Sequence, residues 1–183
     1  MAESASAGGG GRPATRGEIA LARLDVEYLR HKYAKATDLL GVNTPEAIAQ
    51  GNAIYHEIFA PDARIRTSTD GEVRLEAKGP DGWAEVANRA LANYVSTQHL
   101  VGSQVVDVTD LIMDDAGEVV SGEGTMTSYL QAWHAREDSV WIFMGTYADK
   151  VRFVPDVGWQ IYDMDLMFTS GDDRDLGLPR ETG

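Results

Sequence analysis

The chain of 183 residues contains no cysteine, which excludes disulfide bonds, thiolate nucleophiles, iron–sulfur clusters and zinc sites built on cysteine. Basic residues are few: 16 Lys and Arg stand against 29 Asp and Glu, so the formal net charge is -13. Phosphate backbones and anionic lipid surfaces are bound by clustered Lys and Arg, so we expect neither a nucleic acid nor a membrane as partner. No apolar run approaches the roughly 20 residues that span a bilayer.

The common enzyme motifs are also missing. The sequence has no Gly-x-Gly-x-x-Gly opening a helix, no phosphate loop, no Gly-x-Ser-x-Gly elbow and no His-Glu-x-x-His. The four histidines, at positions 31, 56, 99 and 134, are scattered without the spacing of metal ligands. We therefore expect no metal site and no cofactor.

The two ends of the chain differ in composition from its middle. Residues up to about Arg16 are rich in Ala, Ser and Gly, and they lack the basic start and apolar centre of a secretory signal. We expect a disordered tail over residues 1–17, one domain over residues 18–170, a short tail over residues 171–183, and a cytoplasmic protein.

Apolar residues recur at helical spacing in the first half of the domain. One stripe runs from Ile19 to Leu40 in steps of three and four, and Gly41 can end that helix. Thr44 before Pro45 marks the start of a second helix, which Pro61 stops. A third helix is predicted after residues 79–81, which read Gly-Pro-Asp.

After Thr97 the sequence changes to long β-rich segments separated by short polar turns. The predicted strands cover residues 99–108, 119–133, 140–154 and 159–168, with short strands near residues 63–67 and 73–76. Helices followed by a meander indicate an α+β domain in which helices cover one face of a curved antiparallel sheet. Because bulky apolar residues occur on both sides of the strands, the second face should line a pocket or meet another subunit, and we expect a homodimer or homotrimer.

His99 is the histidine best placed for chemistry. It stands at a transition from helix to strand between apolar residues, and imidazole titrates near neutral pH, as a general base must. A buried histidine bonded to a backbone carbonyl is the alternative that periodicity alone favours. His31, His56 and His134 lie in polar helix turns or in a charged turn, so we expect them to face solvent.

Asp38 is ambiguous on geometry. It follows Tyr33 by five residues, which turns an ideal helix about 140° away from the apolar stripe. On a straight helix Asp38 should face water, and only a bend or end near Thr37 would turn it toward a pocket.

Several short segments carry a family resemblance. They are residues 32–38 (Lys-Tyr-Ala-Lys-Ala-Thr-Asp), residues 58–63, residues 97–103, residues 145–150 and the pair Gly158-Trp159. In order, from about Glu18 to Phe168, they resemble the SnoaL-like family of the nuclear transport factor 2 fold superfamily, and within it the group of bile-acid dehydratase, hexachlorocyclohexane dehydrochlorinase and scytalone dehydratase. That resemblance implies a cone-shaped domain with an internal pocket.

The resemblance also implies a site and an activity. By position, His99 and Asp38 match the family's proton-abstracting dyad, and Tyr33 matches its hydrogen-bond donor toward a substrate oxygen. The implied protein is a cofactor-independent lyase, a dehydratase or an enzyme of related elimination, acting on a small cyclic or aromatic substrate. The residues expected to line the pocket are Tyr55, Phe59, Tyr129, Trp133, Tyr147 and Met167.

Two departures from the family pattern limit what can be carried over. The segment Leu39–Tyr55 is longer than the family's usual link between the first two helices. On the last strand, Met167 and Phe168 stand where the bile-acid enzyme has an arginine. The candidates to replace that arginine's polar contact are Arg64, Arg66 and Arg152. The alternatives are an isomerase or cyclase with the same base, a noncatalytic subunit such as those of ring-hydroxylating dioxygenases, and a small-molecule binding protein.

Overall fold

A computed structural model describes residues 11–175 of the chain. Its helices are α1 (Arg16–Val42), α2 (Pro45–Ile58) and α3 (Gly79–Leu91). Its strands are β1 (Arg12–Pro13), β2 (Phe59–Thr69), β3 (Glu72–Lys78), β4 (Ser96–Met113), β5 (Val119–Ala135), β6 (Ser139–Val154) and β7 (Gly158–Asp175). This architecture confirms the predicted α+β class.

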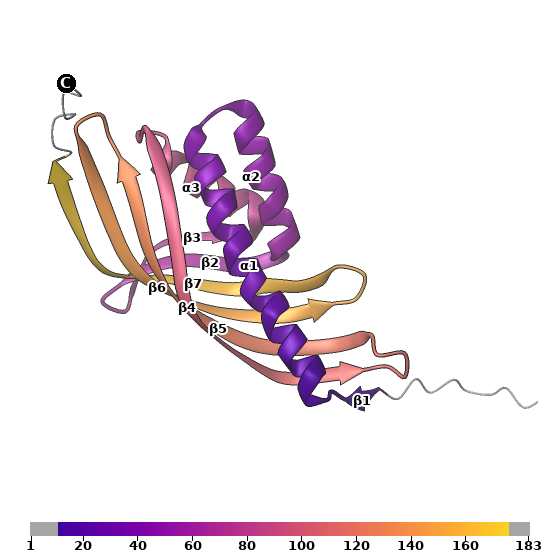
Figure 1. Cartoon of the computed structure of the whole chain (residues 1–183). Helices are drawn as coiled ribbons and strands as arrows, with labels where there is room; N and C mark the ends of the chain where they lie inside the picture. Colours follow the sequence, from indigo (N-terminus) through magenta and orange to yellow (C-terminus); the bar gives the residue numbers. More distant parts are fainter. Residues whose placement is uncertain (1–10, 176–183) are drawn as a thin grey trace, which may run out of the picture.

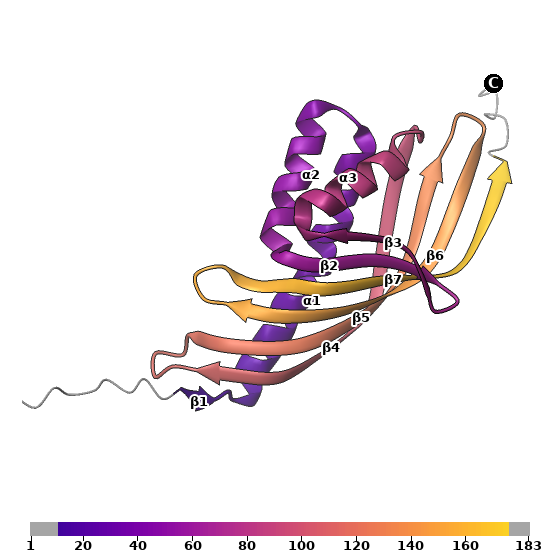
Figure 2. The same ribbon diagram turned by 180° about the vertical axis from the view of Figure 1, so that it is seen from behind.

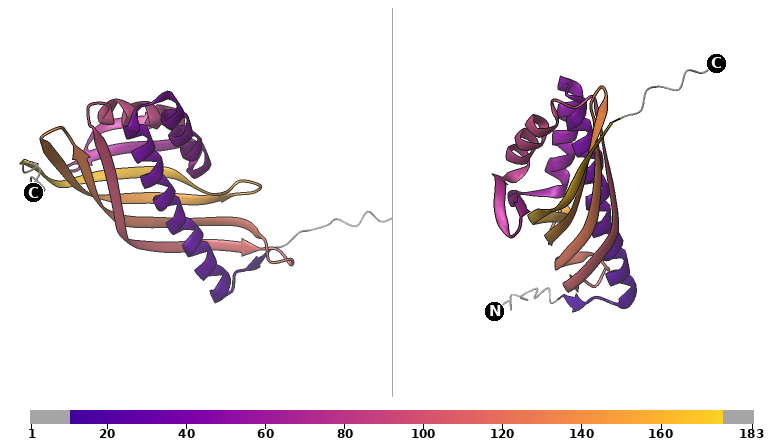
Figure 3. Two further views of the ribbon diagram at one scale, coloured as in Figure 1. Left: turned by 45° about the horizontal axis from the view of Figure 1, so that its top comes forward. Right: turned by 90° about the vertical axis from the view of Figure 1, so that its left-hand side faces the viewer.

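The strands form one open, curved sheet of seven strands in the order β1-β4-β5-β6-β7-β2-β3. All neighbours are antiparallel except β2 and β7, which run parallel. Helix α1 crosses the long strands diagonally, and α2 and α3 gather with β2 and β3 at one end of the sheet (Figure 1). Figure 2 shows the same arrangement from behind, and the two views of Figure 3 show how the curved sheet and the helices enclose that end of the molecule.

Helix α1 is longer than its apolar stripe predicts, and it is unbroken. Thr15 caps its start: the Thr15 hydroxyl accepts a hydrogen bond from the Glu18 backbone amide, and the Glu18 carboxylate accepts one from the Thr15 amide. The helix ends beyond Gly41, at Val42, because Asn43 adopts the left-handed conformation that closes it. Its buried side chains include Val26, Tyr33 and Leu40, so the predicted face is the one that packs on the core.

The strands extend beyond their predicted ends, and this moves the boundaries of the domain. Arg12 and Pro13 pair with Met113 and Ile112 of β4, so residues 12–17 belong to the fold rather than to the predicted tail. At the other end β7 continues to Asp175, five residues past the predicted boundary. The rest of both predicted tails lies outside the described residues. Within residues 11–175, no helix is both long and apolar enough to cross a membrane.

Side chains alternate strictly along β5, and this alternation decides which residues can reach the interior. From Gly122 to His134 the even-numbered residues are buried and the odd-numbered residues are exposed. Leu130, Ala132 and His134 therefore point inward, whereas Tyr129 and Trp133 point away from the helices.

Candidate functional site

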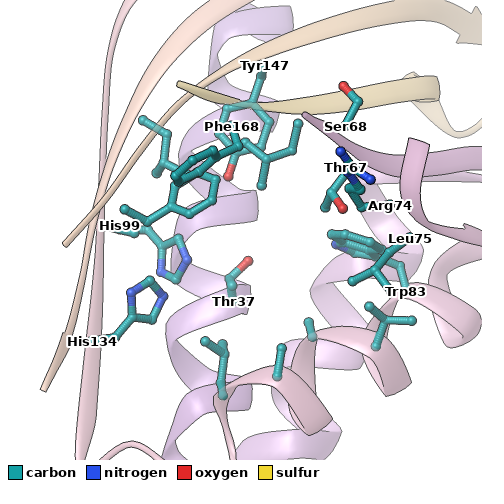
Figure 4. A pocket seen from close by; sticks show the side chains of 18 of the residues that line it. Thr37, Thr67, Ser68, Arg74, Leu75, Trp83, His99, His134, Tyr147 and Phe168 are labelled. Carbon is teal, nitrogen blue, oxygen red and sulfur yellow. The ribbon is translucent and has the colours of Figure 1, made fainter. Parts of the chain in front are cut away.

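A cavity of about 420 Å³ lies between α1, α3, the hairpin of β2 and β3, and the inner face of the sheet (Figure 4). Apolar and aromatic side chains make up most of its wall, as is usual for pockets that bind small molecules. Its polar side chains gather in two places. One group comprises Tyr33, Thr37, His99, His134 and Tyr147, and the other comprises Thr67, Ser68, Thr69 and Arg74.

His99 and Asp38 meet at the edge of this cavity. His99 Nδ1 lies 2.7 Å from Asp38 Oδ1, and the His99 backbone amide donates to Asp38 Oδ2 at 3.3 Å. Thr97 Oγ1 donates to Asp38 Oδ1 at 3.2 Å, which further orients the carboxylate. A carboxylate only accepts hydrogen bonds, so Nδ1 of His99 is the donor in this contact, and in the neutral tautomer Nε2 keeps a lone pair.

The expectation that a straight α1 would leave Asp38 in water is wrong. The helix continues unbroken through position 38, yet Asp38 makes three hydrogen bonds, because the first residues of β4 lie along this flank of α1. A helical wheel measures direction from the helix axis alone and contains no information about a strand that packs beside the stripe.

Tyr33 also lies at the cavity, in a buried hydrogen-bonded cluster. Trp83 Nε1 donates to the Tyr33 hydroxyl at 3.1 Å. Thr37 Oγ1 donates to the Tyr33 carbonyl at 2.8 Å and lies 2.7 Å from the Tyr55 hydroxyl. Tyr33 and Tyr55 stack with ring centroids 5.5 Å apart. The structure thus places Tyr33 and His99 in the wall of one cavity, with Asp38 hydrogen-bonded to His99 outside that wall.

The six residues predicted to line the pocket divide into three groups. Tyr147 lies in the cavity wall. The prediction is wrong for Tyr55 and Phe59, which are fully buried behind Tyr33 and do not reach the cavity. The prediction is wrong for the remaining three, which project from the outer face of the sheet: Tyr129 is 65% exposed, Trp133 37% and Met167 36%.

His134, which we expected to face solvent, lies in the cavity wall instead. Strand β5 continues to Ala135, so position 134 is an inward position of the strand rather than part of a turn. Its Nδ1 lies 3.3 Å from the Trp141 carbonyl oxygen, and its ring meets that of His99 edge to face at 5.6 Å. Burial, followed by the nearby charge of His99, lowers the pKa of His134 to about 4. His31 and His56 are exposed, as predicted.

A comparison of the sequence with models of protein families agrees with this fold. The SnoaL-like domain model matches residues 19–165. The chain belongs to the SnoaL-like domain family. A search of the curated proteins found no match.

Solved structures of several proteins share the fold at low sequence identity. A proposed scytalone dehydratase from Novosphingobium aromaticivorans is 18% identical, with 88% of this chain and 93% of that chain covered and a TM-score of 0.64. A hexachlorocyclohexane dehydrochlorinase from Novosphingobium barchaimii is 10% identical, with 90% and 97% covered and a TM-score of 0.63. The beta subunit of a proposed aromatic-ring-hydroxylating dioxygenase from Novosphingobium aromaticivorans is 15% identical, with 83% and 92% covered and a TM-score of 0.59. These likenesses show the nuclear transport factor 2 fold.

None of the three arginines considered as replacements lines the cavity of this SnoaL-like domain. Arg64 pairs with Glu76, Arg66 with Asp163 and Asp165, and Arg152 with Asp62. The arginine at the cavity is Arg74 of β3, which the sequence analysis did not single out.

Arg74 shares its wall with hydroxyl groups of β2. A β-bulge between Thr67 and Ser68 shifts the strand register, and these two successive residues both line the cavity. The polar groups of the SnoaL-like pocket therefore stand on two opposite walls, with His99 on one and Arg74 on the other (Figure 4). Within residues 11–175, no group of three or more His, Asp or Glu side chains could hold a metal ion.

Proposed function

We propose that this SnoaL-like protein is a cofactor-independent lyase that removes water, or another small fragment, from a small cyclic or aromatic compound. The observation that carries the proposal is the contact of His99 Nδ1 with Asp38 at the edge of an apolar cavity. A neutral imidazole whose Nδ1–H is held by a carboxylate offers Nε2 as a base, and the carboxylate stabilises the imidazolium that forms.

The proposed reaction balances without a further reactant. His99 Nε2 takes a proton from a carbon of the substrate, and the electron pair of that C–H bond forms a carbon–carbon double bond. A hydroxyl group on the neighbouring carbon leaves with the electrons of its C–O bond and receives the proton back from the imidazolium. The products are the alkene and water, and His99 returns to its neutral form.

Tyr33 is the proposed donor toward a substrate oxygen. Its hydroxyl accepts from Trp83 Nε1, which fixes the position of the oxygen and leaves the hydroxyl hydrogen for another acceptor. A donor that is already oriented stabilises charge as it develops in the transition state. Tyr33 and Trp83 both line the cavity, which places this donor among apolar side chains.

The likeness to solved structures supports an elimination reaction. Two of the structural relatives are named for such reactions, a dehydratase and a dehydrochlorinase. The cavity volume suits a ligand of one or two rings, and its mostly apolar wall favours a cyclic or aromatic skeleton. An isomerase or cyclase would use the same base without losing a fragment.

A screen of cyclic β-hydroxy ketones in deuterated water tests the proposal. Mass spectrometry should detect loss of water with the wild-type protein and none above background with His99→Gln. His31→Gln is the matched control, because it makes the same chemical change at an exposed histidine of α1. Deuterium exchange without loss of water would indicate an isomerase, and neither change for any compound would contradict catalysis by this dyad on such substrates.

A further inference from the structure

Arg74 gives the cavity a positive charge. Among the wall residues within the described part of the chain, Arg74 is the only Lys or Arg, and no Asp or Glu is present. This contrasts with the whole chain, whose formal net charge is -13. A guanidinium stays protonated at physiological pH, and beside apolar side chains its charge is screened less than in water. The wall therefore favours a ligand that carries a negative charge.

A β-bulge turns Arg74 toward this cavity. Thr67 and Ser68 of β2 pair with Leu75 and Val73 of β3, so Arg74 is the extra residue between two registered pairs. Regular alternation along β3 would send the side chains of Arg74 and Leu75 to opposite faces of the hairpin. Both line the cavity instead, as expected where a bulge redirects a side chain.

The protein uses only part of the hydrogen-bonding capacity of Arg74. Its Nη1 lies 2.9 Å from Oε2 of Glu72, a residue outside the cavity wall. Both side chains are largely exposed, 52% for Arg74 and 72% for Glu72, so this ion pair contributes little to stability. A guanidinium has five N–H donors in a planar fork, and a single contact leaves donors for a second carboxylate.

Hydroxyl groups of β2 stand in the same wall as Arg74. Thr67, Ser68 and Thr69 line the cavity, and the strand register places Arg74 beside the first two. The Ser68 hydroxyl donates to Asp165 Oδ1 at 2.8 Å and is committed to the protein. The hydroxyls of Thr67 and Thr69 can each donate one hydrogen bond to an anion.

We propose that Arg74, with the hydroxyls of Thr67 and Thr69, binds a carboxylate of the substrate, and that the substrates are therefore cyclic or aromatic carboxylates. The inference rests on the proposed function and narrows its substrate class. Because Arg74 and His99 stand on opposite walls, the carboxylate is remote from the C–H bond that reacts and serves to orient the ring (Figure 4). One arginine balances the single charge of a carboxylate, whereas a phosphate would bring uncompensated charge into an apolar cavity.

Isothermal titration calorimetry at low ionic strength tests this inference with two probes, 3-phenylpropanoate and its neutral amide, 3-phenylpropanamide. The probes share a ring and chain and differ in charge. The wild-type protein should bind the carboxylate with a dissociation constant roughly 10-fold below that of the amide, as expected for charge-assisted hydrogen bonds. Added salt should narrow this difference, because Arg74 is half exposed.

Arg74→Gln should raise the dissociation constant of the carboxylate roughly 10-fold and leave that of the amide unchanged. Arg64→Gln is the matched control and should bind both probes like the wild type, because Arg64 is an exposed arginine of β2 that pairs with Glu76 and does not line the cavity. Glu72→Gln should bind the carboxylate at least as tightly as the wild type, because Arg74 loses a competing partner. All three positions are exposed, so each variant should melt near the wild-type temperature.

Three results would overturn the carboxylate site. They are equal affinity of the wild type and Arg74→Gln for 3-phenylpropanoate, no binding of this probe to the wild type, and tighter binding of phenyl phosphate than of the carboxylate.

The outcomes for Arg74 and for the lyase proposal can be told apart. Carboxylate binding that depends on Arg74, in a protein that eliminates nothing from any candidate substrate, would leave the binding site standing and contradict the function. Elimination that needs His99, with a KM for carboxylate substrates that Arg74→Gln does not raise, would leave the function standing and overturn the carboxylate site.

Discussion

His99 and His134 meet edge to face in one cavity wall, but their partners give them different chemistry. The Nδ1 of His99 faces the carboxylate of Asp38. The Nδ1 of His134 faces the carbonyl of Trp141, which is neutral. The Nδ1–H of His134 must donate to that carbonyl, so its Nε2 keeps a lone pair, and at neutral pH His134 can accept a hydrogen bond from a ligand hydroxyl.

The low pKa of His134 predicts acid sensitivity. Its pKa is about 4 in the folded protein and 6.5 ordinarily, so between these values the unfolded chain binds a proton that the folded chain does not. The free energy of unfolding should be unaffected by this group above pH 6.5, fall as the pH drops from 6.5 to about 4, and change no further below that. The loss should be on the order of 3 kcal/mol.

Urea denaturation across this pH range measures the effect. Between pH 6.5 and about 4, the unfolding free energy of the wild type should fall relative to that of His134→Phe, because the variant has no group at position 134 that titrates. His31→Phe, at an exposed position, should follow the wild type. Parallel curves for the wild type and His134→Phe would mean that His134 is protonated as readily in the folded protein as in the unfolded chain.

At the scale of elements, α1 and β5 show what could be predicted from the sequence. Steps of three and four in the apolar residues located α1, and polar turns located β5 and β6 close to their observed ends, whereas β4 and β7 continue well past their predicted ends. The sequence motifs also pointed to His99 and Asp38 as a pair, which their contact in the structure agrees with. Helical periodicity could not predict that contact, because it depends on β4 packing against the flank of α1.

The cavity wall was harder to predict than the elements. Aromatic residue type suggested Tyr129 and Trp133, but both are odd-numbered residues of β5 and face outward. The useful signal was the alternation of inward and outward residues along the strand. Leu130 and Ala132 are inward residues, and His134 is the next inward position. Ending the strand at Trp133 instead of Ala135 removed His134 from it and hid this signal. The successive residues Thr67 and Ser68 both line the cavity, and nothing in the sequence clearly marks them for that place.

At the scale of the whole molecule, the outer face of the sheet carries an exposed apolar patch. Its exposed side chains include Leu100, Tyr129, Trp133 and Met144. Leu100, Tyr129 and Met144 border one shallow groove across β4, β5 and β6. An apolar patch of this kind on a sheet face is typical of an interface.

We therefore predict a homo-oligomer, a dimer or a trimer, that buries this face. Sedimentation at micromolar concentration should give a species larger than the 19.9 kDa chain. Tyr129→Lys should shift the equilibrium toward the monomer, since it places a charge on that face, whereas Arg23→Lys on α1 should not. A wild-type protein that sediments only as a monomer would contradict the prediction.

The pairing of His99 with Asp38 is tested most directly by the turnover of His99→Gln, Asp38→Asn and the double variant on a compound that the wild type converts. Each single substitution should lower kcat by roughly 10²–10⁴-fold, the usual contribution of a positioned acid–base group. The two side chains act as one unit, so the double variant should be scarcely slower than the slower single variant. Near-normal turnover of both folded single variants, or effects that multiply in the double variant, would contradict a base formed by His99 and Asp38 together.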